Sequence, residues 1–415
     1  MNSSAKILII GFVWPEPNSS AAGSRMMQLI ELFHKQNWEV HFATTAVETV
    51  HMVDLNELGV SAKQIQLNHD SFDEYVKELQ PNMVLFDRFM IEEQFGWRVA
   101  EQCPDAIRVL DTEDLHCLRK TRQEAFKKNI EFTTNTLLSS EIAKRELASI
   151  YRCDLTLIIS TYEMELLQNV FKVDKSLLCY LPFLIDKITN ENFSELPKFD
   201  DRQHFMCIGN FRHEPNWNMV LYLKQTIWPM IRKELPKAEL HVYGSYPSEK
   251  VTQLNKKTEG FLIKGWVDDV NRVMQESRVC LAPIRFGAGI KGKFTDAMQN
   301  GLPSITTSIG AEGMCDGLPW NGSIVDTPEE IAFKAVGLYE NEELWLQAQQ
   351  NGLQVINTIY SNVKYQESFI TALNSLSKNL VQHRTSNFTG AMLMHHTLKS
   401  TRYLSKWIAE KEKNK

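Results

Sequence analysis

The sequence contains few cysteines, and none is arranged as in a cross-linked or metal-bound core. Seven cysteines are spread over 415 residues, and no C-x-x-C pair occurs among them. An odd number at wide spacing argues against both a disulfide framework and a zinc cluster. We therefore expect reduced thiols and a cytoplasmic location.

Long apolar runs are missing as well. The run from Ile7 to Trp14 contains Gly11, is too short to cross a bilayer and lacks a signal-peptide cleavage pattern. No other segment is long and apolar enough to span a membrane. We interpret residues 7–14 as a buried first strand.

Neither sign of charge dominates the chain. It has 45 basic and 51 acidic side chains, a formal net charge of −6. This balance does not favour a nucleic acid partner, so an anionic ligand would need a local positive site.

What the sequence does contain is an alternation of short apolar segments with helical patterns. The segments KILIIGF, EVHFAT, MVLFD, IRVLDT and LTLIIS predict strands, and 114–150 predicts an inserted helical pair. After a polar segment, HFMCIGN, AELHVYG, FLIKGWV, VCLAPI and PSITT repeat the scheme. Strands alternating with helices predict parallel βαβ units. We therefore predict an α/β protein with domains at 1–188 and 204–360, a linker at 189–203 and a helical tail at 361–415.

The stretch RFGAGIKGKF, residues 285–294, matches two phosphate-binding motifs. Gly287, Gly289 and Gly292 form G-x-G-x-x-G, and Lys293 completes G-x-x-x-x-G-K. The ATP or GTP motif needs Ser or Thr after the lysine to ligate Mg²⁺, but Phe294 stands there. The dinucleotide motif belongs to the first strand of its domain, and this loop follows the fourth.

Both motifs share a physical basis that does fit. A glycine-rich turn lets backbone N–H groups approach an anion, and the helix that follows adds partial positive charge. Arg285, Lys291 and Lys293 supply full charges. We predict a diphosphate site; the alternative is a tight turn with surface lysines. Glu312 stands twenty residues past Gly292, where the ribose-binding acid of a dinucleotide site could fall, so the dinucleotide interpretation remains an alternative.

The wider stretch VCLAPIRFGAGIKGKFTDAMQNGLPSITT resembles the donor half of GT-B glycosyltransferases, specifically the retaining family 4 (group 1). The segments FMCIGNFRHEPNW and CDLTLIISTYEMELLQ also resemble parts of this family. The resemblance implies two Rossmann-like domains that face a cleft, with part of the C-terminal helical region crossing back to the first domain. It implies a nucleoside diphosphate sugar as co-substrate and no cofactor or metal.

The resemblance also assigns site residues. The family has two glutamates eight positions apart; Asp296 stands at the second, toward the donor ribose, and Ala288 at the first. Arg212 and Lys291 would hold the diphosphate, as catalytic as well as binding groups. The full donor side comprises Gly23, Arg212, Gly265, Trp266, Arg285, Gly287, Ala288, Gly289, Ile290, Lys291, Lys293 and Asp296.

Polar residues after the N-terminal strands supply the acceptor side. His116 and Asp114 are the catalytic candidates beside the reacting sugar. The other acceptor-side candidates are Asp87, Arg88, Asp111, Glu113 and Arg119.

Structural interpretations stand beside these assignments. His116 would pair with an acid at a helix start, Arg212 would be a surface arginine paired with Glu214, and Asp296 would only stabilise the start of its helix.

The leading functional hypothesis is a retaining, metal-independent glycosyltransferase of polysaccharide biosynthesis with a glycan, lipid-linked or other hydroxyl acceptor. Alternatives are a nucleotide-sugar epimerase, a non-catalytic GT-B partner protein and an NTPase. In the tail, Met394, Leu398, Tyr403, Leu404, Trp407 and Ile408 recur at helical spacing beside basic residues. This pattern predicts either peripheral contact with the inner face of a membrane or a packing helix with a solvated end.

Overall fold

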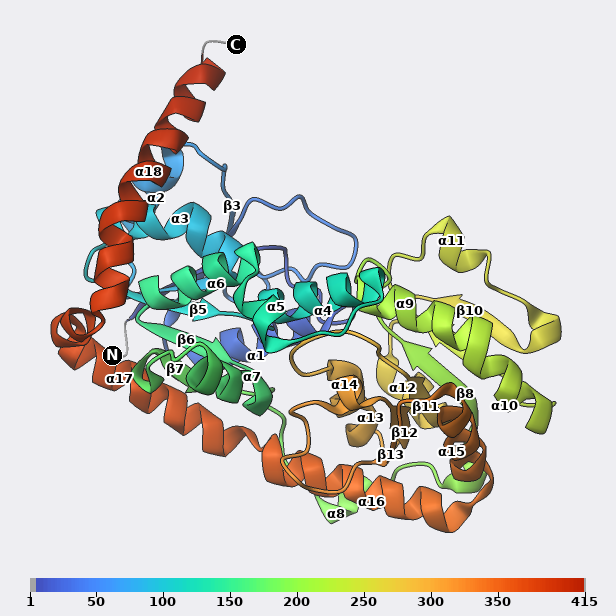
Figure 1. Cartoon of the computed structure of the whole chain (residues 1–415). Helices are drawn as coiled ribbons and strands as arrows, with labels where there is room; N and C mark the ends of the chain where they lie inside the picture. Colours follow the sequence, from blue (N-terminus) through green and yellow to red (C-terminus); the bar gives the residue numbers. More distant parts are fainter. Residues whose placement is uncertain (1–4, 414–415) are drawn as a thin grey trace.

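The computed structural model describes residues 5–413, apart from the side chains of 362 and 396–399. Two parallel sheets, each with helices on both faces, form the two halves of the molecule (Figure 1). No helix within the described residues is apolar over enough length to span a membrane. All seven cysteines are free, and six of them are buried.

The first sheet has seven strands in the order β3-β2-β1-β4-β5-β6-β7. Its strands are β1 (Lys6–Gly11), β2 (Glu39–Thr44), β3 (Ser61–Gln64), β4 (Met83–Asp87), β5 (Ile107–Asp111), β6 (Leu155–Ile158) and β7 (Leu178–Tyr180). Its helices are α1 (Ala21–Lys35), α2 (Ser71–Leu79), α3 (Phe89–Gln102), α4 (His116–Lys128), α5 (Thr134–Leu138), α6 (Glu141–Arg152) and α7 (Thr161–Glu165). Central strands such as β4 are buried on both faces, as their continuous apolar sequences require.

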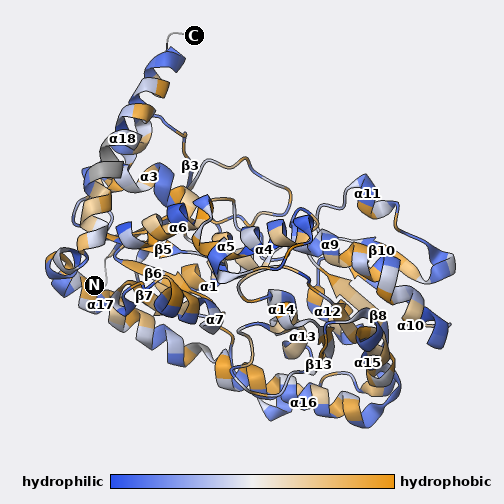
Figure 2. Cartoon of the chain, in the orientation of Figure 1, coloured by the Kyte–Doolittle hydropathy of each residue, from blue (hydrophilic) through white to orange (hydrophobic). Residues whose placement is uncertain are grey.

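The second sheet has six strands in the order β10-β9-β8-β11-β12-β13. They are β8 (Gln203–Ile208), β9 (Leu240–Tyr243), β10 (Phe261–Gly265), β11 (Ser277–Ala282), β12 (Ser304–Thr306) and β13 (Gly322–Ile324). The helices are α9 (Glu214–Tyr222), α10 (Trp228–Glu234), α11 (Glu249–Thr252), α12 (Val270–Glu276), α13 (Gly292–Gln299), α14 (Ser308–Ala311), α15 (Pro328–Glu340) and α16 (Glu342–Ile359). Figure 2 shows the apolar strands inside and polar helix faces outside.

The chain crosses between the halves twice, at adjacent places. The first crossing follows β7 and contains the short helix α8 (Asn190–Ser194). The second lies between α16 and α17 (Asn362–Ser386), where Ile185 pairs with Ser361 in a parallel bridge. The backbone N–H of Ile185 donates to the carbonyl of Tyr360 at 3.1 Å. These contacts hold the two crossings side by side.

The last two helices lie on the first half of the molecule. Phe369 and Leu373 of α17 are fully buried in the same apolar cluster as Ile7 and Ile9 of β1. The final helix, α18 (Phe388–Lys413), packs on α3 and α6 and then extends beyond α2 (Figure 1).

Three details differ from the sequence prediction. The strands β3, β7 and β13 were not predicted, because each has only three or four residues and β3 (SAKQ) is polar. The segment 114–150 forms three helices, α4, α5 and α6, instead of two. A short threonine-capped turn, α5, separates the longer helices.

Candidate active site

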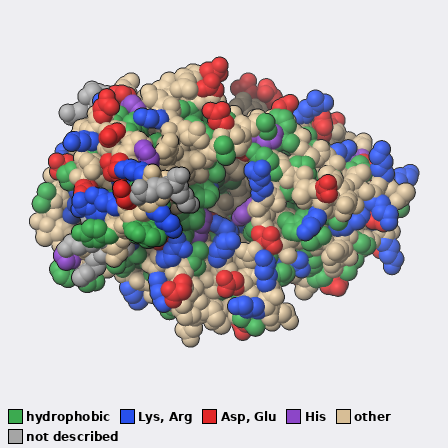
Figure 3. All heavy atoms as spheres, turned by 90° about the horizontal axis from the view of Figure 1, so that it is seen from above, with side chains coloured by type: hydrophobic (Ala, Val, Ile, Leu, Met, Phe, Trp, Pro, Cys, Tyr) green, Lys and Arg blue, Asp and Glu red, His purple; other side chains and the backbone are tan. Residues whose placement is uncertain are grey.

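The cleft lies between the carboxyl ends of the two sheets, where α/β sheets bind ligands. Loops of the first half meet loops of the second there: Trp266 Nε1 donates to the carbonyl of Asn18 at 3.3 Å, and the Tyr246 hydroxyl donates to Glu16 at 2.7 Å. Figure 3 shows a hollow in this view, with basic and histidine side chains gathered at its rim.

His116, Asp114 and Arg119 form one group at the start of α4. Arg119 Nε donates to Asp114 at 2.6 Å, and His116 Nε2 lies 3.4 Å from the same carboxylate. Burial alone would raise the pKa of Asp114, but Arg119 and His116 outweigh it and lower that pKa. Burial, with Arg119 and Arg88 nearby, lowers the pKa of His116 to about 3. His116 is therefore neutral at pH 7 beside an ionised carboxylate.

His213, at the start of α9, faces this group from the other half of the molecule. Loss of bulk water in the cleft, together with the charge of Arg119, lowers its pKa; Lys293 and Arg88 act in the same direction. Charged groups of both halves therefore act on His213. His213 was not predicted from the sequence, and only its place in the loop between β8 and α9 would have indicated it.

Lys293 is the cation of the glycine loop that belongs to this group. Its Nζ donates to Asn216 Oδ1 at 2.7 Å, and burial lowers its pKa. Among the described residues no carboxylate pairs with it. Its charge is therefore not neutralised by an ion pair of this kind.

The glycine loop itself is docked onto the first half of the molecule. The N–H of Gly289 donates to Glu163 Oε1 at 2.9 Å, and Arg122 donates to the carbonyl of Gly287 at 3.0 Å. Gly289 has φ +63, and a Cβ there would lie 2.7 Å from Asp114 Cβ, so glycine is required. The sequence places Gly289 on the donor side, but in the structure its N–H is bonded to Glu163.

Two acids complete this contact between the halves. Glu312 forms a bidentate pair with Arg122, with both N–O distances at 2.7 Å. This pairing leaves Glu312 no role as the ribose-binding acid of a dinucleotide site. Glu163 of α7 is fully buried, and burial raises its pKa to about 8.

Lys291 lies within the same contact. Its Nζ donates to the carbonyl of Gly289 at 2.9 Å. Burial lowers its pKa to about 8, although Glu312, Glu163 and Asp114 oppose that shift. Lys291 therefore already has acidic neighbours, unlike Lys293.

Ala288 and Ile290 are buried. Ala288 packs into an apolar cluster of the first half, with Leu115 and Cys117 among its members. A glutamate at 288 would have to be accommodated against that apolar surface. A carboxylate does contact the loop at the next residue, where Glu163 of α7 accepts from the Gly289 N–H.

Asp296 lines a cavity of about 410 Å³ between α1, the first crossing and α13. Ala21, Ser24, Gln28, Gly292, Thr295 and Gln299 line it with Asp296 and residues 183–188. Burial raises the pKa of Asp296 to about 7. Gly23 stands at the start of α1, where a Cβ would lie 2.4 Å from the backbone of Glu16.

Several residues that were predicted to lie in the site instead make contacts within the protein. Asp111 is fully buried and pairs with Arg25 at 3.0 Å, which joins α1 to β5, so it does not face an acceptor. Asp87 accepts from the N–H of Phe12 at 2.9 Å. Arg285 donates to Asn218 at 2.9 Å and stacks on Tyr222.

Others remain at the cleft. Arg88 (φ +74) stacks on Phe12, and its Nε lies 3.7 Å from Asp87. Glu113 lies beside them; burial, then Asp111 and Asp87, raise its pKa well above the ordinary range.

Arg212 is exposed and stacks on Tyr246, with 3.6 Å from Cζ to the ring centroid. Its suggested partner Glu214 pairs with Lys127 instead. Gly265 (φ +74) precedes Trp266, which stacks on His51 across the cleft.

Comparisons with known proteins agree with this architecture. Residues 202–341 match the family model described as "Glycosyl transferases group 1". A search of curated proteins found no match. The predicted resemblance is confirmed for the C-terminal domain, which is that of a glycosyltransferase.

Solved structures show the fold. Sucrose-phosphate synthase from Thermosynechococcus elongatus is similar with a TM-score of 0.67 at 14% identity, over 90% of this chain and 99% of that one. HepE from Anabaena, in complex with UDP and glucose, gives 0.62 at 12%, over 90% and 100%. A mutant of S. aureus TarM, in complex with fondaparinux, α-GlcNAc-glycerol and UDP, gives 0.57 at 12%, over 73% of this chain but only 58% of that one. The GT-B fold expected from the sequence is confirmed.

Proposed function

We propose that the protein transfers a sugar from a nucleoside diphosphate sugar to a hydroxyl group of a glycan or lipid-linked acceptor. The observation that carries this proposal is the convergence of Lys293 and His213 from one domain with Arg88, Arg119 and His116 from the other. This cluster lies in the cleft beside the glycine loop of a group 1 glycosyltransferase domain. The UDP bound in HepE supports a nucleoside diphosphate as the leaving group. The α-GlcNAc-glycerol bound in TarM supports a hydroxyl group as the acceptor.

The chemistry follows from where charge develops. Breaking the bond between sugar and phosphate leaves negative charge on the diphosphate, and cations already in place lower that barrier. Lys293 and Arg212 would hold the charge from the donor side. Arg88 lies on the acceptor side. This arrangement supports transfer without a cofactor or a metal.

The histidines have a different role in the proposal. His116 and His213 are neutral at pH 7, so each offers a hydrogen-bond donor and an acceptor to sugar hydroxyls without adding charge. Retention of configuration would follow from attack on the face that the diphosphate leaves, with a phosphate oxygen taking the acceptor proton. No protein nucleophile is then needed.

Binding and product analysis test the proposal. We expect one of UDP, GDP, ADP or dTDP, or its sugar, to raise the melting temperature of the full chain. The sugar donor identified this way, incubated with hydroxyl acceptors in chelator, should give a product whose anomeric configuration by NMR matches the donor. A changed sugar without acceptor would indicate an epimerase. No shift with any nucleotide would favour a non-catalytic partner protein.

We also propose that α18 contacts an anionic membrane surface, on which a lipid-linked acceptor would also lie. Tyr403, Leu404 and Trp407 are 68%, 57% and 60% exposed. Lys411 lies 5.0 Å from the centre of the Trp407 ring. Arg402 pairs with Glu101 and fixes the opposite side of the helix to α3. The side chain of Leu398, also part of the predicted pattern, lies outside the described residues.

Vesicle sedimentation tests this second proposal. The full chain should pellet with phosphatidylglycerol vesicles and not with phosphatidylcholine vesicles. Trp407→Ala should reduce the bound fraction severalfold, whereas Phe333→Ala, which removes an aromatic side chain 75% exposed on α15, should not. Equal binding of both variants would remove α18 from the contact.

A further inference from the structure

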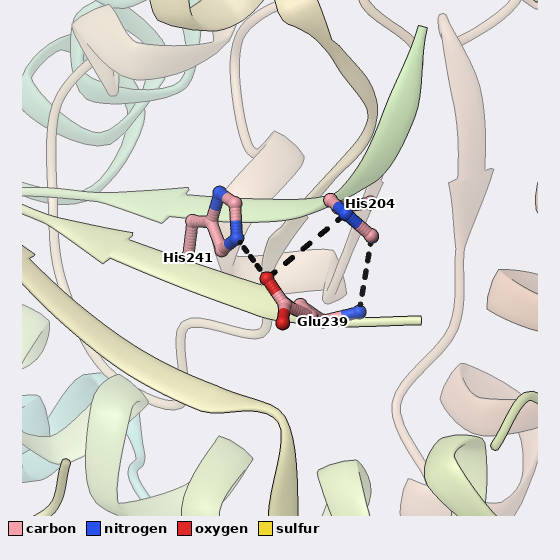
Figure 4. Close-up of side chains that lie close together, drawn as sticks. All are labelled: His204, Glu239 and His241. Atoms are coloured by element: carbon pink, nitrogen blue, oxygen red, sulfur yellow. Dashed lines mark hydrogen bonds and ion pairs between the residues drawn. The ribbon is translucent and has the colours of Figure 1, made fainter. Parts of the chain in front are cut away.

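His204, Glu239 and His241 bring three metal-ligand side chains together outside the cleft (Figure 4). One ligand atom from each lies within 4.8 Å of the other two. His241 Nε2 is 2.8 Å from Glu239 Oε2, and His204 Nε2 is 4.0 Å from the same oxygen. The two imidazole centroids are 5.2 Å apart.

The backbone explains why these side chains meet. Glu239 directly precedes β9 and His241 lies in it, two residues further on, so their side chains project to the same side. His204 lies in the neighbouring strand β8 with φ +64, an unfavourable conformation for a residue that is not glycine. The strained position is held by the His204 N–H, which donates to the Tyr339 hydroxyl at 3.1 Å. Strain of this kind concentrates at functional sites.

We propose that these residues form a binding site for a divalent transition metal ion, with Zn²⁺ as the best match. Two imidazoles and one carboxylate are a common set of three zinc ligands that leaves a fourth position for water. Tetrahedral coordination would separate the ligand atoms by about 3.4 Å. The two distances to Glu239 fall on either side of that value, so small side-chain movements suffice.

One hydrogen bond of His204 has to change when this residue binds a metal ion. A neutral imidazole is the form that binds metal. His204 Nδ1 accepts from the Glu239 N–H at a long 3.3 Å, and this weak bond would be given up when Nε2 takes the metal.

Two cations lie near the three ligand residues. Arg278 is held by other contacts, and Lys264 lies on the neighbouring strand. Arg278 donates to the carbonyls of Arg202 and Tyr339 and stacks on Phe199. The exposed Lys264 is on β10, the next strand. The local positive charge lowers affinity but leaves the face of the triad open: the side chains of His204 and Glu239 are 29% and 37% exposed.

The site is remote from sugar transfer. His204 is at the amino end of β8, and the cleft loop begins five residues later at Gly209, about 16 Å along an extended strand. A metal here would join the amino ends of β8 and β9. We therefore assign it a structural role, separate from the donor site.

Zinc titration of the chelator-treated full chain tests the proposal. Calorimetry should show one Zn²⁺ per chain, and Zn²⁺ should raise the melting temperature. His241→Ala and His204→Asn should each weaken binding at least tenfold and abolish the thermal shift. Co²⁺ used as a probe should give a visible spectrum without thiolate charge transfer.

The chain contains a matched control. His41 and Glu39 on β2 form a similar pair at 2.7 Å, also two residues apart, without a third ligand in the described residues. His41→Ala should bind Zn²⁺ like the wild type. Circular dichroism confirms folding of each variant. Absence of zinc binding, or equal binding by His241→Ala and wild type, would overturn the proposal.

Discussion

Lys293 and Lys291 differ in what surrounds their ammonium groups, and this difference predicts different roles. Lys293 has a neutral amide partner, so its charge is available to a diphosphate. We expect Lys293→Ala to weaken nucleoside diphosphate binding about tenfold to a hundredfold, because hydrogen bonds to charged groups contribute about 1.5–3 kcal/mol. Calorimetric titration of the nucleotide identified by thermal shift measures the change.

Two further lysines complete that measurement, Lys334 as a control and Lys291 as a second test. Lys334→Ala, on the exposed side of α15, should leave nucleotide affinity unchanged. Lys291→Ala tests the sequence-based assignment directly. Weaker binding would support a diphosphate contact, whereas unchanged binding would limit Lys291 to the contact between the domains. Unchanged binding by Lys293→Ala would contradict the proposed donor site.

The buried carboxyl group of Glu163 should make the stability of the folded protein depend on pH. Burial raises its pKa to about 8 in the folded protein, above the value near 4.3 of an unfolded glutamate. Between those values the folded state binds more protons, so its stability falls as pH rises. Glu163→Gln removes this titration while retaining an acceptor for the Leu115 and Gly289 N–H groups.

We expect Glu163→Gln to be more stable than the wild type, by an amount that grows from pH 5 to pH 8. One pKa unit corresponds to about 1.4 kcal/mol, so the gain should exceed that amount at pH 8. Thermal unfolding at several pH values measures it. Glu165→Gln, on the same helix but exposed, is the control and should show no such trend. Parallel profiles for Glu163→Gln and wild type would contradict this prediction.

Individual site residues could be predicted only where a motif or a strand end marked them. The glycine loop and His116 were selected as candidates in this way. Glu163 was missed because it is one acid in an ordinary helical pattern, and only the tertiary contact brings it to Gly289. Asp111 was placed on the acceptor side because strand ends carry functional groups, but its partner Arg25 is distant in sequence.

At the scale of elements, the pair between α4 and the turn after α14 fixes the glycine loop to the first domain. Arg122 and Glu312 have side chains 7% and 16% exposed. Removing one partner of a buried pair costs about 3–5 kcal/mol. We expect Glu312→Gln to lower the melting temperature by several degrees and to increase the radius of gyration measured by X-ray scattering as the cleft opens.

Lys127 and Glu214 give the comparison for that experiment. They also join the two domains, but their side chains are 58% and 46% exposed. Exposed pairs contribute about 0–1 kcal/mol, so Lys127→Ala should change neither measurement. Equal effects of Glu312→Gln and Lys127→Ala would show that the buried pair does not control closure.

Elements with a strong period or a long apolar run were predicted correctly, including the central strands of both sheets. Edge strands were not. β3, β7 and β13 are short and lie at or near sheet margins, so their formation depends on the neighbouring strand more than on their own composition. For such segments tertiary context overrides local propensity.

At the scale of the whole molecule, α17 makes the first domain depend on the end of the chain. Phe369 is fully buried in the core around β1. Replacing a buried phenylalanine by alanine costs about 3–5 kcal/mol. Phe369→Ala should therefore lower the melting temperature by several degrees, whereas Phe388→Ala, which is 75% exposed, should not. Calorimetry of the full chain decides between these outcomes.

The two adjacent crossings between the halves have a mechanical consequence. Two rigid bodies joined at two neighbouring points keep one easy motion, a rotation about the line through those points. Sliding or twisting would shear the bridge between Ile185 and Ser361 and the paired bonds of Asn357 with the Ile188 backbone. We therefore expect the cleft to open by rotation about an axis at the crossings, which would alter the width of the cleft much more than the alignment of the loops across it.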